Sequence, residues 1–175
     1  MHNKVFVEIG VCDFDTLEPL LSNGWRGYFV EPIEEFANKL PQDKTLEAAI
    51  SDHDGEMEMY VAKNDNTWRR GSSHAVIQSG EKILEKSPEF VKEKITVKCY
   101  TLHRYLMIMG IEYIDLLKLD CEGHEKDILD AYDWSVYPTM IKLEHHHIDD
   151  IKMKKFLEDK GYVVYTEKRD MYAIR

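Results

Sequence analysis

Short apolar runs alternate along this chain with segments whose apolar residues recur every three or four positions. Uninterrupted apolar runs are typical of strands buried on both faces of a parallel sheet, and the helical spacing is typical of helices packed against one. We therefore predict an α/β fold with a doubly wound, mostly parallel, seven-stranded sheet and helices on both faces. The strands should begin at Val5 and cover about 27–31, 45–50, 113–119, 140–144, 162–165 and 171–174, the last two as an antiparallel C-terminal hairpin.

Proline and glycine mark where the helices between these strands begin and end. The leucines after the first strand share one helical face, and Pro19 is tolerated only in a first turn, so the first helix should begin near Asp15 or Thr16. Gly110 should end a helix over 102–109. Further helices are expected over 33–40, 122–134 and 149–160.

The spacing of the apolar residues changes after the third predicted strand. Apolar and polar residues alternate over 56–61, behind the turn signal Asp54-Gly55, which predicts an inserted β-hairpin between this extra strand and the third strand. A second alternating stretch covers 94–100. Between them, residues 64–80 are polar and aperiodic, which is typical of a functional or disordered loop. We expect this loop to close over the ligand site as a lid.

Length, charge and cysteine content narrow the class of protein. At 175 residues the chain fits one domain, and no apolar run approaches the roughly 20 residues of a membrane span. The net charge of −10 disfavours general nucleic-acid binding, because phosphate contacts require a basic face. The 3 cysteines lack metal-binding spacing and fit reduced thiols. We expect a single cytoplasmic domain over residues 1–175 that binds no membrane.

Polar residues stand at the ends of several predicted strands, where doubly wound sheets bind their ligands. They are Glu8 to Gly10, Glu31, Ser51 with Asp52, Asp120, and Glu144 with His145. Gly10 lets the backbone approach a ligand closely, and the carboxylate of Glu31 can accept hydrogen bonds from two ribose hydroxyls. This pairing is how such a sheet holds an adenosine, so the strand ends predict an enzyme with a nucleoside cofactor.

Several segments carry recognisable motifs: EIGVCDFDT at the first strand, Glu31-Pro32 at the second, AAISDHDG at the third and Gly-Ser-Ser at 71–73. The most specific is IDLLKLDCEGHEKDIL, residues 114–129. Together they resemble the FkbM family of S-adenosylmethionine-dependent methyltransferases, from Val5 to about Tyr165. Phe14 departs from the family by replacing the second glycine of the usual turn, and the helix that precedes the first strand in the family is absent.

The resemblance implies S-adenosylmethionine as cofactor and roles for the residues at the strand ends. Glu31 is the candidate for the ribose hydroxyls, Glu8 and Gly10 for the methionine end, and Ser51 with Asp52 for the adenine edge. The other candidates for cofactor binding are Asp13, Asp15, Thr16, Pro32, Ser73 and Asp120.

Methylation of an oxygen requires a group that accepts the proton of the hydroxyl. Asp120, at the end of the fourth parallel strand, is the first candidate for this base. The further candidates are Glu122, His124, Glu144 and His145. We expect no metal, with Asp120, Glu144 and His145 as the alternative set of ligands for a hard cation.

The expected activity is O-methylation of a hydroxyl on a small molecule or sugar, the acceptor class that the resemblance implies. Two alternatives stay open. A nicotinamide-dependent oxidoreductase shares the glycine turn and the acidic second-strand end, but GVCDFD lacks the further glycines that seat a pyrophosphate. The other is a nucleoside-cofactor-binding module whose catalysis has decayed, suggested by Phe14 and the absent helix.

Overall fold

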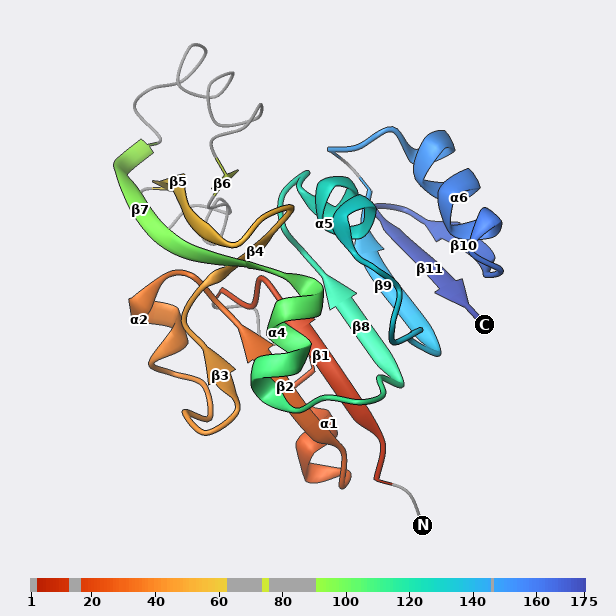
Figure 1. Cartoon of the computed structure of the whole chain (residues 1–175), viewed down its shortest axis with the longest axis horizontal. Helices are drawn as coiled ribbons and strands as arrows, with labels where there is room; N and C mark the ends of the chain where they lie inside the picture. The colour runs from red at the N-terminus through yellow and green to blue at the C-terminus, as the bar shows by residue number, and fades with distance from the viewer. Residues whose placement is uncertain (1–2, 13–16, 63–73, 76–90, 146) are drawn as a thin grey trace.

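The computed structural model describes residues 3–12, 17–62, 74–75, 91–145 and 147–175. Their backbone forms two sheets, of which the larger has seven strands in the order β10-β11-β9-β8-β1-β2-β3 (Figure 1). All its neighbouring strands are parallel except β11, which runs antiparallel to β9 and to β10. This is the predicted mostly parallel sheet with an antiparallel C-terminal hairpin. Its strands are β1 (Val5–Ile9), β2 (Arg26–Val30), β3 (Thr45–Leu46), β8 (Leu116–Leu119), β9 (Met140–Glu144), β10 (Val163–Glu167) and β11 (Asp170–Ile174).

The two central strands are buried along their whole length, as their apolar sequences predict. β1 lies between β2 and β8, with Val7 opposite both Tyr28 and Leu117. β9 has the predicted bounds, whereas β8 begins at Leu116 rather than at residue 113. Just before β8, the backbone N–H of Val5 donates to the carboxylate of Asp115 at 2.7 Å, and the N–H of Asp115 donates to the carbonyl oxygen of Val5 at 2.9 Å.

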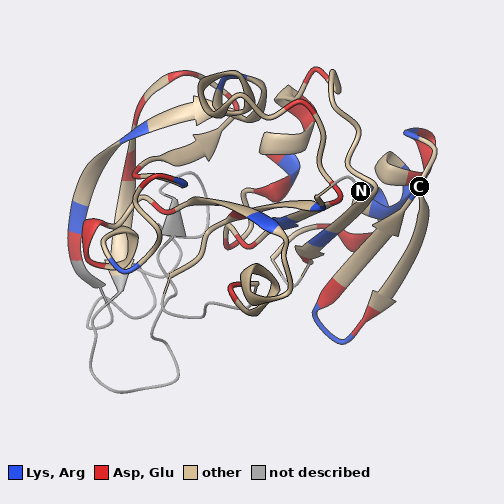
Figure 2. Ribbon diagram, turned by 90° about the horizontal axis from the view of Figure 1, so that it is seen from below, with Lys and Arg blue, Asp and Glu red and all other residues tan. Residues whose placement is uncertain are grey.

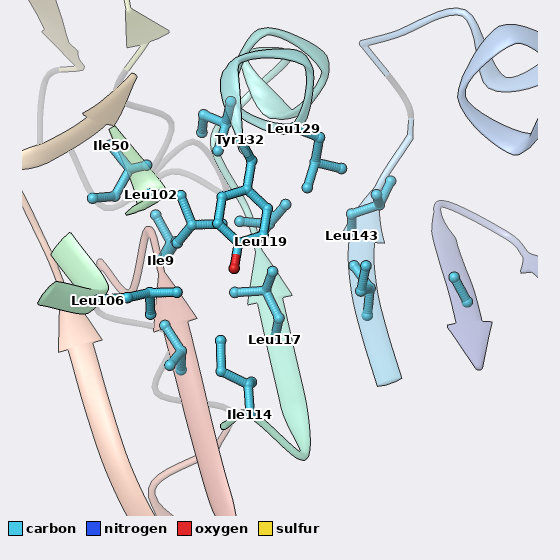
Figure 3. Close-up of a cluster of buried hydrophobic side chains, with 14 of the residues drawn as sticks. Ile9, Ile50, Leu102, Leu106, Ile114, Leu117, Leu119, Leu129, Tyr132 and Leu143 are labelled. Carbon is cyan, nitrogen blue, oxygen red and sulfur yellow. The ribbon is translucent and has the colours of Figure 1, made fainter. Parts of the chain in front are cut away.

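Helices cover both faces of this sheet, as predicted. On one face, α4 (Leu102–Met109), α5 (Glu125–Ala131) and α6 (Asp150–Asp159) enclose the main core, to which Leu102, Leu119 and Leu129 belong (Figure 3). On the other face, the leucines of α1 (Pro19–Ser22) pack against Phe6 and Phe29. The short α2 (Glu34–Ala37) follows β2.

The helix ends show which boundary signals were informative. α4 has the predicted bounds, because Gly110 adopts φ 63° and ends it. α6 begins after Asp149, whose side chain accepts a hydrogen bond from the N–H of Lys152 at 3.1 Å. α1 begins at Pro19, later than predicted, since proline occupies its first position. The expected starts, Asp15 and Thr16, lie outside the described residues.

The second sheet has the order β4-β7-β5-β6 and lies beyond the carboxyl ends of β1 and β2 (Figure 1). Its strands are β4 (Ala49–Ser51), β5 (Gly55–Ala62), β6 (His74–Ala75) and β7 (Val91–Thr101). The predicted third strand over 45–50 is divided between the sheets, because β3 pairs with β2 whereas β4 pairs with β7. The extra strand over 56–61 is present as β5, but its antiparallel partner is β7 rather than the third strand. Most of the expected lid, 64–80, lies outside the described residues.

Charged residues are distributed over many elements. Figure 2 shows lysines and arginines interspersed with acidic residues along the ribbon. None of the helices in the described part of the chain is long and apolar enough to cross a bilayer.

Candidate functional site

The carboxyl ends of β1, β2, β8 and β9 lie side by side at one edge of the large sheet, which we call the carboxyl edge; Gly10, Glu31, Asp120 and Glu144 end or directly follow these strands. Gly10 has φ 78°, and a Cβ atom added there would lie 2.0 Å from the carbonyl oxygen of Asp120. A side chain at this position would therefore collide with the backbone of the loop over residues 120–124, which we call the β8 loop. Gly10 thus allows the loop that follows β1, the β1 loop, to run against the β8 loop.

The carboxylate of Glu31 holds the loop that follows β1. Its Oε2 accepts hydrogen bonds from the N–H groups of Val11 at 3.1 Å and Cys12 at 2.8 Å, and its Oε1 accepts one from Ile33 at 2.9 Å. These bonds stabilise Cys12 at φ 52°, a conformation that costs free energy for a residue with a side chain. Burial raises the pKa of Glu31 above its usual value, and the three backbone donors oppose part of that rise. Since a carboxylate accepts roughly four hydrogen bonds, the three backbone donors leave Glu31 about one acceptor position, and the residue is only 3% exposed in this conformation.

A buried ion pair lies beneath the same loops. Glu8 and Lys118 are cross-strand neighbours on β1 and β8, and Lys118 Nζ lies 2.8 Å from Oε1 of Glu8. The ammonium group also lies 3.5 Å from Oδ2 of Asp120, whose side chain is 39% exposed. Burial alone would lower the pKa of Lys118, but the carboxylates of Glu8 and Asp120 outweigh it and raise that pKa. Lys118 therefore stays charged and ties the edge residue Asp120 to the sheet interior.

Ser51 and His124 connect the second sheet to the β8 loop. The buried Oγ of Ser51, at the end of β4, lies 3.1 Å from Nε2 of His124 and also donates to Asp52 at 3.0 Å. On its other side, Nδ1 of His124 lies 3.1 Å from Oδ2 of Asp127. Burial lowers the pKa of His124, against the opposing effect of Asp127 and Asp52. His124 is thus buried and bonded at both ring nitrogens, and Asp52 and Asp127 are the exposed members of this group.

The β8 loop concentrates acidic side chains. Oε1 of the buried Glu125 accepts a hydrogen bond from the N–H of Cys121 at 2.7 Å, and its Oε2 accepts one from Gly123 at 3.0 Å, which fixes Glu122 between them at φ 54°. Burial raises the pKa of Glu125 to about 7. Burial and the nearby carboxylate of Glu144 raise the pKa of Glu122 to about 8.

Glu122, Glu144 and His147 form a compact group at the carboxyl edge. One possible ligand atom from each lies within 4.8 Å of those of the other two. Nε2 of His147 is 3.3 Å from Oε2 of Glu122. Among the described residues, this is the acidic and histidine group that the fold assembles, rather than the predicted alternative of Asp120, Glu144 and His145.

The remaining predicted site residues fall into two groups. Pro32 is half-buried behind Glu31, and the Nε2 atom of His145 is buried without a hydrogen-bond partner among the described residues. Asp13, Asp15, Thr16 and Ser73 lie outside the described residues. Sequence reasoning missed Lys118 and His147. Lys118 had a usable signal, since it interrupts an apolar strand as Glu8 does, and two opposite charges on buried strands are expected to pair.

The carboxyl edge has the chemistry that S-adenosylmethionine requires. The cofactor carries positively charged sulfonium and ammonium groups, and the edge carries the carboxyl groups of Glu31, Asp120, Glu122 and Glu144, of which the Asp120 side chain is 39% exposed. Gly10 removes the side chain that would separate the β1 loop from the β8 loop. The residues therefore fit a cationic nucleoside at this edge.

Comparison with known proteins identifies the family. Residues 4–164 match the family model described as the methyltransferase FkbM domain. No curated protein matches the sequence significantly. Among solved structures, the chain is similar to the precorrin-6y C5,15-methyltransferase of Geobacter metallireducens GS-15, with 14% identity and a TM-score of 0.45, over 99% of this chain and 80% of that one. Because the family model spans nearly the whole sequence, this chain belongs to the FkbM methyltransferase family, and its cofactor is S-adenosylmethionine.

Proposed function

We propose that the protein methylates an oxygen atom, the hydroxyl of a small molecule or sugar, with Asp120 as the proton acceptor. The observation that carries this proposal is the position of Asp120. Its carboxylate is partly exposed just after the central strand β8, and its backbone carbonyl lies against Gly10, which follows the neighbouring strand β1. The acceptor hydroxyl and the cofactor would meet between these two strand ends.

The residues of this edge divide the work of the reaction. The bound cofactor supplies an electrophilic methyl group on sulfur. Glu31 holds the β1 loop and offers its remaining acceptor position to the ribose. Asp120 would orient the acceptor hydroxyl and take its proton as the new carbon–oxygen bond forms and the methyl–sulfur bond breaks, so that a methyl ether and S-adenosylhomocysteine result. Lys118 restrains the Asp120 carboxylate from below without leaving the interior.

Glu122 and Glu144 are secondary candidates for the same proton. Glu122 is suited by its pKa of about 8, which lies near the pH of the cytoplasm, but its side chain is only 17% exposed. Asp120 is the more accessible carboxylate and stands nearer to β1. His124 is less suited, because Ser51 and Asp127 occupy its two ring nitrogens.

The proposal is tested by incubating the full-length protein with S-adenosylmethionine labelled in its methyl group and a panel of sugars and hydroxylated small molecules. Acceptor-dependent formation of S-adenosylhomocysteine, together with the label on an oxygen of one acceptor, is the expected result. A label found only on nitrogen, carbon or sulfur would contradict O-methylation. Tight cofactor binding without turnover on any acceptor would favour the module with decayed catalysis.

A further inference from the structure

The β8 and β9 loops bring three donor groups to one point. Glu122 comes from the β8 loop, Glu144 is the last residue of β9, and His147 follows three residues later. Their donor atoms lie within 4.8 Å of one another. A metal ion bonds such donors at roughly 2.1 Å, so three ligands of one ion stand at most about 4.2 Å apart, and only small side-chain movements are needed.

The backbone of the β8 loop is shaped to point Glu122 at this position. Glu122 adopts φ 54°, and Gly123 next to it adopts φ 103°. A Cβ atom on Gly123 would lie 3.1 Å from the Cβ atom of His147, so glycine there allows the histidine to approach. Unfavourable conformations of this kind persist where the surrounding structure holds them, here through the two hydrogen bonds to Glu125.

The electrostatics of the group favour a cation. Glu144, Asp120 and Glu125 all act repulsively on Glu122, and the guanidinium of Arg169 acts in the opposite direction. An ion with two positive charges would add to the attraction of Arg169 and His147 and offset this repulsion further. One imidazole and two carboxylates are a donor set typical of first-row divalent metals such as Mn²⁺ and Zn²⁺.

We propose that Glu122, Glu144 and His147 bind one divalent metal ion of this kind at the carboxyl edge, in the same loop as Asp120. Three protein ligands leave positions on the ion for oxygen atoms from outside the protein. In a protein with the proposed function, on which this last step rests, those positions take the oxygens of the acceptor. The acceptor class is then a molecule with two adjacent oxygen atoms, one held by the ion while Asp120 takes the proton of the hydroxyl that is methylated.

The test measures binding of Mn²⁺ alone to the cofactor-free, full-length protein, from the loss of the electron paramagnetic resonance signal of free Mn²⁺. The expected result is one ion per chain. His147→Ala and Glu144→Gln should each weaken binding by at least about tenfold, the scale on which changes around a metal site act. His103→Ala is the matched control. Nδ1 of His103 also lies close to one carboxylate, 2.9 Å from that of Asp133, but among the described residues the two do not belong to a group of three possible metal ligands.

Two results would overturn the site: no uptake by the wild-type protein, or uptake that His147→Ala retains as fully as His103→Ala does. The first would mean that His147 and Glu122 form only an ion pair. Because His147 lies in a loop after β9, its variant reports on the site even if Glu144→Gln fails to fold. Methyl transfer without metal uptake would remove the site and leave the proposed function standing. Metal uptake without methyl transfer to oxygen would support the metal site and contradict the proposed function.

Discussion

The loops after β1 and β8 lie against each other. They share the same kind of backbone support but carry different side chains. Each contains a residue with a side chain at positive φ, Cys12 at 52° and Glu122 at 54°, and each is held by a buried carboxylate that accepts backbone N–H groups. In the β1 loop the carboxylate is Glu31, from the neighbouring strand, and the described loop residues 10–12 carry no charge. In the β8 loop the carboxylate is Glu125, the first residue of the helix α5 that follows, and the loop itself carries Asp120 and Glu122.

This difference suits the two loops to different tasks at the carboxyl edge, contact with the cofactor for one and acid–base or metal chemistry for the other. The described part of the β1 loop, residues 10–12, presents backbone and glycine, which suits close contact with a cofactor. The β8 loop presents acidic side chains whose burial raises two pKa values, to about 8 for Glu122 and about 7 for Glu125. Carboxylates held in this way are ready to take up a proton or a metal ion. The experiments below break one loop or the other, and the largest effects are expected beneath the β1 loop.

The largest effect is expected from Lys118→Met, which removes the cation between Glu8 and Asp120. Glu8 would then be a buried carboxylate without its ammonium partner, which typically costs about 3–5 kcal/mol in the free energy of unfolding. Urea denaturation measures this loss. Lys142→Met is the matched control, because Lys142 lies beside Lys118 on β9 but pairs with a partly exposed Asp170. Its cost should stay near 1 kcal/mol or less, the usual scale of such pairs. Equal losses would show that the buried pair does not support the loops.

Gly10→Ala tests the contact between the two loops themselves. The new methyl group would meet the carbonyl oxygen of Asp120, and φ 78° is unfavourable for alanine, so the expected loss is about 3 kcal/mol. Gly24→Ala separates these causes, since Gly24 has φ 80° but no atom within 4 Å of an added Cβ. Thermal and urea unfolding should show a clearly smaller loss for Gly24→Ala. If the two variants lose the same stability, the loops do not run as closely together as described.

The local pattern predicted some of these elements to the residue and could not predict others. α4 and β9 have the expected bounds, because each ends at a strong signal in its own sequence, Gly110 and the acidic end at Glu144. The division of the third strand was not predictable in this way. β4 pairs with β7, which follows about fifty positions later, and a periodic pattern carries no information about so distant a partner.

The site shows the same limit. Glu31, Gly10 and Asp120 were found because they end buried strands, and the fold does place them at one edge. His147 was missed because the candidates were sought at or directly after the strand ends, and His147 lies three residues beyond the end of β9. The strand ends at Glu144, and the N–H of Ile148 turns back to the carbonyl oxygen of His145. Only the path of this turn brings His147 to Glu122.

Asp120→Asn tests the chemistry of the β8 loop. The change keeps the shape of the side chain but removes the proton acceptor, so turnover on the acceptor found in the panel should fall by about 10²-fold or more. Cofactor affinity, measured by titration calorimetry, should change little. Asp133→Asn, on the surface beside His103, is the control for loss of one carboxylate. Full turnover with a lower melting temperature would reduce Asp120 to a structural residue, and loss of cofactor binding would make it a binding residue.

The smallest effect is a pH dependence of stability that arises from Glu125. Burial raises its pKa from 4.5 to about 7, so between these values the folded protein holds a proton that the unfolded chain has released. The unfolded state then binds fewer protons, and the free energy of unfolding falls as the pH rises through this window. The loss between pH 5 and pH 8 should be about 2 kcal/mol.

Glu125→Gln removes this titration while keeping the size of the side chain. It should cost stability at pH 5, because an amide cannot accept from both Cys121 and Gly123, but that cost carries no pH dependence of its own. The wild-type protein should therefore lose its advantage over the variant as the pH rises from 5 to 8. Urea unfolding at both pH values, with a chelator present so that no metal ion occupies the neighbouring carboxylates, measures the difference. Glu158→Gln, on the exposed face of α6, reports the effect of removing a carboxylate that is not buried. A constant difference between wild type and Glu125→Gln would mean that burial does not raise the pKa of Glu125 and that this carboxylate is ionised in the folded protein over the whole range, and the contrast with the loop held by Glu31 would then rest on Asp120 and Glu122 alone.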